Sequence, residues 1–156
     1  MSLSGAPSRL LTIALLVSAC GTAGGLRGSA GPVQWEVVDM RRSVTPDSQT
    51  LRWDFVVVLK ETAGGRVTFE RMVTRLVPSS SHPDAVQGAI QEEPFNQVLG
   101  PHLELRVTMS NSLTFGPGVV PGNTAMRGSM ARRWEFIGKD DSERPVRVAV
   151  VVTFNP

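Results

Sequence analysis

The sequence predicts an all-β protein, folded as an antiparallel sandwich of about seven strands with one short helix. Apolar residues recur at every second position in several segments, which is typical of strands with one buried face. Loops rich in glycine and proline separate these segments. The chain of 156 residues is 41% hydrophobic and 19% charged, as expected for one globular domain with a buried core.

The strongest alternation runs through residues 51–60. Every odd-numbered residue there is apolar, whereas Arg52, Asp54 and Lys60 lie on the opposite face. Four further segments alternate, the last of them more weakly: 33–37, 103–109, 146–154 and 130–137. Three tryptophans are expected to be the large core residues of this sandwich: Trp35, Trp53 and Trp134.

A hairpin is predicted where Glu-Thr-Ala-Gly-Gly-Arg separates Leu59 from Val67. Pairing Leu59 with Phe69 keeps apolar residues on one face, and it requires a three- or five-residue loop with a glycine in the left-handed region. Beyond Phe69 the alternation changes phase. We therefore expect a bulge near Glu70 and Arg71, or burial of both faces there.

One short helix is predicted between two prolines. Ser81 would cap this helix, Pro83 suits its first turn and Pro94 would end it. Four apolar residues would share one of its faces: Ala85, Val86, Ala89 and Ile90. With this helix, residues 33–156 are expected to form an immunoglobulin-like β-sandwich. Residues 111–129 would form a long loop, and loops of that length are uncommon unless they are functional or mobile.

The first 19 residues have the layout of a secretory signal peptide. A segment ending in Arg9 precedes the apolar run 10–19, which would span about 15 Å as a helix. Because a hydrocarbon core is about 30 Å thick, a permanent transmembrane helix is not expected. Residues 21–32 contain five glycines and are typical of a flexible tether.

The segment Val17-Ser18-Ala19-Cys20 resembles the lipobox of bacterial lipoproteins. Valine replaces the leucine that is more common at the first lipobox position. The resemblance implies that residues 1–19 are removed and that Cys20 becomes the first residue of the mature chain. It also implies that Cys20 carries a diacylglycerol and an amino-terminal acyl group such as palmitate.

The resemblance further implies a location in the bacterial cell envelope. Gly21 rather than aspartate follows the cysteine, which favours the outer membrane in a cell with two membranes. A conventional signal peptide, cut after Ala19 or Ala23, is the alternative. Cys20 is the only cysteine, so it has no partner for an intramolecular disulfide, and lipidation would account for this lone exported thiol.

Few residues in the chain are suited to catalysis. Ser81, His82 and Asp84 are too close in sequence to converge as a triad, and a helix-capping turn accounts for the same residues. His102 and Glu104 have a spacing that could bind a metal, but no third ligand accompanies them. We therefore expect no enzyme activity, no cofactor and no metal.

The charge pattern does not indicate a nucleic-acid partner. Of the 16 basic residues only Arg9 precedes Cys20, so the basic residues of the remaining chain nearly balance its 14 acidic residues. Arginine pairs occur at residues 41–42 and 132–133. Because neighbouring strand residues point to opposite faces, solvent-exposed side chains account for these pairs better than a patch for an acidic partner or lipid headgroups.

The predicted function is that of a membrane-anchored binding or scaffolding module for another envelope protein. An edge strand or the 111–129 loop would contact the partner, by strand addition or through loop side chains. Five residues are the candidate loop contacts: Phe115, Val119, Val120, Asn123 and Met126. The alternative is a carrier or sensor of a small ligand held between the sheets or beneath this loop.

Overall fold

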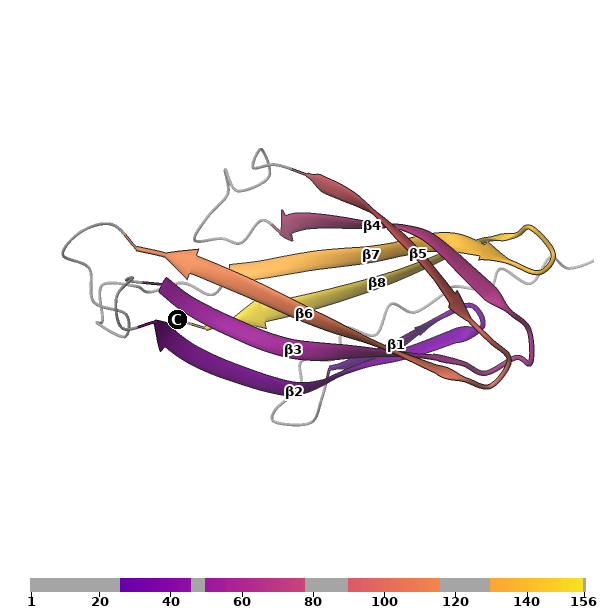
Figure 1. Ribbon diagram of the computed structural model, residues 1–156, viewed down its shortest axis with the longest axis horizontal. Coiled ribbons are helices and arrows are strands. Elements are labelled where there is room, and N and C mark those ends of the chain that lie inside the picture. The colour runs from indigo at the N-terminus through magenta and orange to yellow at the C-terminus, as the bar shows by residue number, and fades with distance from the viewer. Residues whose placement is uncertain (1–25, 46–49, 78–89, 116–129, 156) are drawn as a thin grey trace, which may run out of the picture.

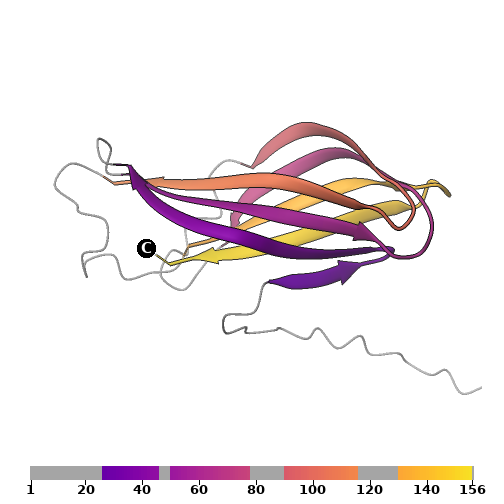
Figure 2. The same ribbon diagram turned by 60° about the horizontal axis from the view of Figure 1, so that its bottom comes forward.

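The computed structural model describes residues 26–45, 50–77, 90–115 and 130–155. These residues form two stacked antiparallel sheets of four strands each (Figures 1 and 2). The first sheet has the order β1-β2-β3-β6 and the second the order β5-β4-β7-β8. The strands are β1 (Arg27–Ala30), β2 (Val33–Thr45), β3 (Thr50–Glu61), β4 (Val67–Val77), β5 (Gln91–Leu99), β6 (Glu104–Thr114), β7 (Met130–Asp140) and β8 (Pro145–Phe154).

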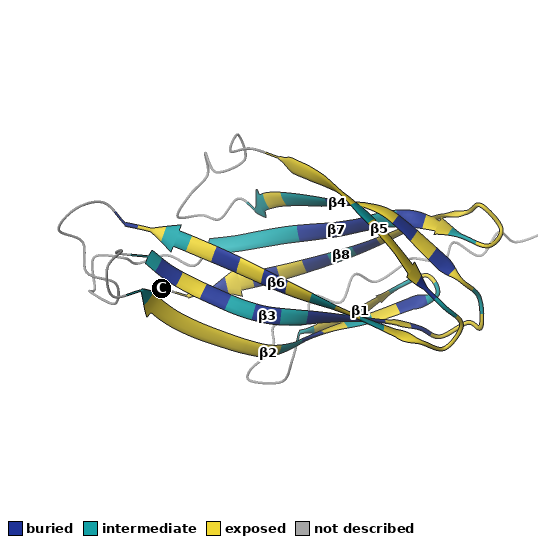
Figure 3. Ribbon diagram, viewed as in Figure 1, coloured by how far each residue is buried: buried dark blue, intermediate teal, exposed yellow. Residues whose placement is uncertain are grey.

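The prediction of an antiparallel all-β protein is confirmed, and one strand more than expected is seen. Within the described ranges, no helix is long and apolar enough to cross a membrane. Figure 3 shows β3 and β8 banded by burial, as expected for strands with one face on the core.

The core lies between the two sheets and is rich in aromatic residues. The ring centroids of Phe55 and Trp134 are 5.3 Å apart, and those of Trp53 and Phe154 are 5.1 Å apart. Such tilted or edge-on pairs add to the free energy gained from burying the rings. The expectation that Trp53 and Trp134 fill the core is confirmed, whereas Trp35 is only half-buried.

The hairpin predicted around residues 59–69 is wrong. β3 pairs with β2 and β6, whereas β4 pairs with β5 and β7, so the connection after Glu61 crosses from one sheet to the other. Leu59 lies opposite Trp35 and Leu105 rather than Phe69. The expected left-handed glycine is confirmed, since Gly64 has a φ of 84°. The expected bulge is confirmed too, because the register of β4 shifts between Phe69 and Arg71.

The helix predicted to end at Pro94 is not seen. Pro94 lies within β5, and Ile90 precedes this strand with its side chain exposed. An edge strand tolerates proline because the missing N–H can face away from the sheet. The other residues assigned to the helix are outside the described residues: Ser81, Pro83, Ala85, Val86 and Ala89.

Part of the expected tether is a strand. Residues 27–30 form β1 and pair with β2, where Gly28 lies opposite Trp35. A Cβ atom on Gly28 would lie 2.7 Å from the indole ring of Trp35, so only glycine lets the ring pack over β1. The sandwich in the described structure therefore includes β1, which precedes the expected boundary at Val33.

Candidate functional site

A cleft of about 390 Å³ opens between the two sheets at the edges formed by β5 and β6. The two strands leave their shared turn and diverge, as Figure 1 shows. The side chains that line the cleft come from both sheets: Met72, Thr74, Gln91, Glu93, Phe95, Val107, Thr108, Met109, Ser110, Arg132 and Trp134. Its lining is mixed, with five apolar or aromatic side chains beside six polar ones, and most of the lining surface is polar.

The edge of β6 itself forms one wall of this cleft. Four consecutive residues, 107–110, line it, although neighbouring strand residues point to opposite faces. Consecutive residues can all border a space only where that space lies along the edge of the strand. Because β6 is the last strand of its sheet, its free side has no strand partner in the described structure.

Arg132 is the cation of the cleft. It shares a face of β7 with Trp134 and Phe136, both of which are buried in the core. It lies opposite Val152 of β8, which is also fully buried. The alternation that builds the core therefore directs this arginine between the sheets rather than to the surface.

Arg132 has no ionic partner in the described part of the chain. Its Nε–H is buried and donates to no acceptor, and none of the ion pairs of the described residues includes this arginine. Burial lowers the pKa of its guanidinium, and no carboxylate opposes this effect. Glu93 also lines the cleft but forms no ion pair with Arg132.

On the opposite face of β7, a buried carboxylate is surrounded by arginines. Glu135 is almost fully buried and pairs with three arginines, with nitrogen to oxygen distances of 3.0 Å to Arg75, 2.7 Å to Arg133 and 3.4 Å to Arg147. Arg133 thus has a carboxylate partner, whereas its neighbour Arg132 has none. The expectation that the arginine pair at 132–133 is surface-exposed is wrong for Arg132.

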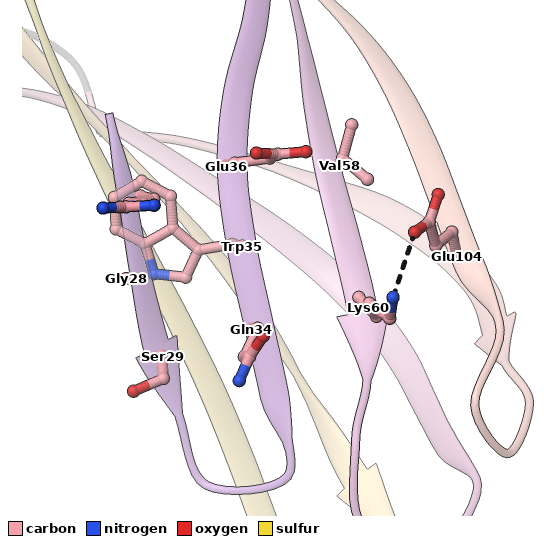
Figure 4. A pocket seen from close by; sticks show the side chains of 9 residues that line it. Gly28, Ser29, Gln34, Trp35, Glu36, Val58, Lys60 and Glu104 are labelled. Atoms are coloured by element: carbon pink, nitrogen blue, oxygen red, sulfur yellow. Dashed lines mark ion pairs between the residues drawn. The ribbon is translucent and has the colours of Figure 1, made fainter. Parts of the chain in front are cut away.

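A second hollow, of about 510 Å³, lies on the first sheet (Figure 4). It extends across β1, β2 and β3 to β6, where Lys60 Nζ lies 3.5 Å from Glu104 Oε1. Its other ionisable residues are Arg27 and Glu36, so its charges balance. No group of three or more histidine, cysteine, aspartate or glutamate side chains in the described ranges could hold a metal.

A buried carboxylate joins two connections at one end of the sandwich. Glu61 accepts hydrogen bonds from the backbone N–H groups of His102 at 2.9 Å, Ala63 at 2.7 Å and Gly64 at 2.9 Å. These donors, the His102 bond above all, lower the pKa of Glu61 to about 2. The turn between β5 and β6 is thereby tied to the crossover between the sheets.

Replacing Glu61 with glutamine should lower the melting temperature by several degrees at pH 7. The amide keeps the shape of the side chain but loses the charge and one of the two acceptor oxygens, and its NH2 group then faces backbone N–H donors. Because the folded pKa of about 2 lies below the ordinary 4.5, ionised Glu61 stabilises the protein above pH 4.5, and this contribution is lost as the pH falls towards 2. Thermal unfolding measured from pH 7 to pH 2 should therefore show that the difference in melting temperature between wild type and variant shrinks as the pH falls.

The matched control for this experiment is Glu104→Gln. Glu104 is half-exposed and forms only a surface ion pair with Lys60, so its loss should change the melting temperature little. If the difference in melting temperature between wild type and Glu61→Gln stayed constant from pH 7 to pH 2, the role assigned to the carboxylate would be contradicted.

Comparison with known proteins identifies the fold but no family. No protein-family model matches the chain, and no curated protein matches it. A solved structure described as Northeast Structural Genomics Consortium target SoR45 is similar over 81% of this chain and 88% of that chain, with 7% identity and a TM-score of 0.56. This likeness is one of fold alone.

A second solved structure is the putative ApaA protein from Bordetella pertussis. The match covers 78% of this chain and 89% of that chain, with 14% identity and a TM-score of 0.48.

The structure describes only some of the site residues expected from the sequence. Phe115 is buried in the core, so in this conformation it is not an exposed partner contact. The remaining candidate contacts lie outside the described residues, as does the proposed lipid site: Val119, Val120, Asn123, Met126 and Cys20. Ser81, His82 and Asp84 are outside the described residues as well.

The pair of residues considered for metal binding is not arranged as a pair of ligands. His102 lies in the turn before β6 with a φ of 55°, and Glu104 pairs with Lys60. A ligand site between the sheets was the alternative expected from the sequence, but none of the residues that line this cleft was predicted to belong to it. Its one available signal was the spacing of Arg132 from Trp134 and Phe136, which places all three on one face of a strand.

Proposed function

We propose that this chain is a lipid-anchored protein of the bacterial envelope that binds another envelope protein by strand addition along β6. The proposed anchor is the lipid on Cys20, and in a cell with two membranes the favoured location is the outer membrane. The domain is proposed to be an immunoglobulin-like sandwich with a binding or scaffolding role, without catalysis, cofactor or metal. Val119, Val120, Asn123 and Met126 are proposed as further contacts with the partner.

The unprotected edge of β6 is the observation that carries this proposal. Its register with β3 is regular from end to end, and the strand contains neither proline nor a bulge. β5, across the cleft, has the usual protections of an edge strand: Pro94, a register shift against β4, and exposed glutamates. The free edge of β8 lies near β1 of the other sheet, and β1 has only four residues. β6 is therefore the edge best suited to receive a strand.

Cross-linking in native membranes followed by hydrogen exchange tests this proposal. A photo-reactive side chain at Ser110, on the β6 edge, should yield one discrete adduct with an envelope protein. The same group at Gln97, on the protected β5 edge, is the matched control and should yield none. The purified partner should then slow amide exchange across Glu104–Thr114 and leave Gln91–Leu99 unchanged. Adducts from both positions, or from neither, would overturn the proposal.

Binding of a small ligand between the sheets is the second candidate function. The cleft volume of about 390 Å³ favours it, because small-molecule sites commonly measure ~300–1,000 Å³. A carrier would be indicated if no protein adduct forms and the purified protein retains an apolar small molecule. The same photo-reactive variants therefore separate the two functions.

A further inference from the structure

The inner face of β7 presents a charge that the rest of the described sandwich does not neutralise. Arg132 lies between the sheets, two positions from Trp134 on the same strand face, and it has no ion pair or hydrogen-bond partner there. An unpaired cation in a partly desolvated site is costly, because water solvates it less well and no carboxylate compensates. The fold alone gives no reason for an arginine at this position.

A second polar group on the facing sheet is also unpartnered. Asn111 is 2% exposed, and neither its Oδ1 nor its Nδ2 has a hydrogen-bond partner among the described residues. It is the next inward-facing residue of β6 after Met109, which lines the cleft. Buried amides of this kind nearly always have partners in folded proteins. Each sheet therefore has an inward-facing polar side chain without a partner in the described chain, and Asn111 is the more deeply buried of the two.

Five apolar or aromatic side chains also line the cleft, beside Arg132 and five other polar ones. Met72, Phe95 and Trp134 line it from the second sheet, and Val107 and Met109 line it from the first. A strand added to β6 would direct every second side chain into this space. One of those side chains would come within reach of Arg132, and its neighbours would contact methionine and aromatic groups.

We propose that the strand bound along β6 carries an acidic residue whose carboxylate pairs with Arg132 inside the cleft, flanked by apolar residues two positions away on either side. This inference rests on the proposed strand addition and adds the chemistry of the partner. A guanidinium can donate two parallel hydrogen bonds to a carboxylate, and such a pair gives register as well as affinity. Arg132 is already partly buried beside Trp134, and this reduced exposure to water strengthens the pair.

Two synthetic peptides test the inference. The first, Val-Thr-Val-Thr-Glu-Thr-Val-Thr-Val, presents valines and one glutamate on a single strand face; in the second, glutamine replaces the glutamate. Calorimetric titration of the purified full chain should show the glutamate peptide binding at least about tenfold more tightly. Arg132→Met should remove this preference and leave the affinity for the glutamine peptide unchanged.

Arg133→Met is the matched control, because Arg133 is the neighbouring residue on the opposite face and pairs with Glu135. It should keep the preference for glutamate. Arg132→Met should leave the melting temperature unchanged or raise it, a result that an arginine with a purely structural role would not give.

Each remaining outcome is decisive. Equal affinities of the two peptides for the wild-type chain, with slowed exchange in β6, would overturn the role of Arg132 and leave strand addition standing. Binding of neither peptide would overturn the inference. Decanoate is the third probe: if it binds in an Arg132-dependent way and neither peptide does, the cleft is a site for small apolar acids.

Discussion

Replacing Gly138 with alanine is expected to lower the free energy of unfolding by about 3 kcal/mol, the upper end of overpacking effects, or to prevent folding. A Cβ atom at this position would lie 2.0 Å from the carbonyl oxygen of Thr68 and 2.7 Å from the Cα of Phe69. Both are backbone atoms, so no side-chain rotation can relieve the contact. Gly138 lies opposite Phe69, next to the bulge of β4, and the missing side chain leaves room for the backbone of Thr68 and Phe69.

Gly65→Ala is the matched control for this substitution. The nearest atom to a Cβ atom at Gly65 is Asp141 Oδ2 at 3.9 Å, an ordinary contact. Thermal unfolding followed by circular dichroism should therefore show Gly138→Ala melting at least about 10 °C below both wild type and Gly65→Ala. A Gly138→Ala protein that melts with the control would show that β4 and β7 can separate at the bulge without cost.

The strands that the sequence predicts best are those with one face covered completely by the opposite sheet. In β3 and β8 every second residue is buried, because both strands have long inner faces against the opposite sheet. The same rule fails for β5, where Glu92, Glu93 and Pro94 obscure any alternation. An edge strand is held by one neighbour and by a few contacts such as that of Phe95 with Phe136, at 5.2 Å between ring centroids. The sequence of β5 therefore shows little of the alternation that predicts a strand.

The pairing of strands depends on contacts that no local pattern contains. Residues 61–66 look like a tight hairpin loop because the two glycines permit left-handed turns. Their conformation is decided instead by the carboxylate of Glu61, which binds the loop and the distant His102. β3 is paired on both sides with β2 and β6, so β4 must enter the other sheet.

The alternation of β7 predicts the face on which Arg132 lies, but it does not predict whether this arginine has an ionic partner. Spacing from Trp134 and Phe136 places it on the inner face, as the structure bears out. Whether a nearby carboxylate neutralises an inward arginine depends on which residues the opposite strands bring near it. The same pair of arginines thus contains one side chain that forms an ion pair with Glu135 and one that forms none in the described chain.

Replacing Cys20 with serine is expected to abolish lipid attachment and to move the protein from the membrane to the soluble fraction. The thiol is the group that would form the thioether to diacylglycerol, and a hydroxyl does not replace it in that reaction. Each buried methylene contributes about 0.8 kcal/mol to membrane binding, so two or three long chains anchor a protein almost permanently.

Incorporation of labelled palmitate is the decisive measurement for this anchor, because an uncleaved leader could still hold part of the variant through the apolar run 10–19. The wild-type chain should take up the label and remain in membranes after washing with carbonate at high pH. Cys20→Ser should take up none and should migrate more slowly where residues 1–19 remain. Thr22→Ser, a conservative change two residues away, should behave as wild type. Label on the serine variant would show that another residue carries the lipid, and an unlabelled wild-type chain would favour a conventional signal peptide cut after Ala19 or Ala23.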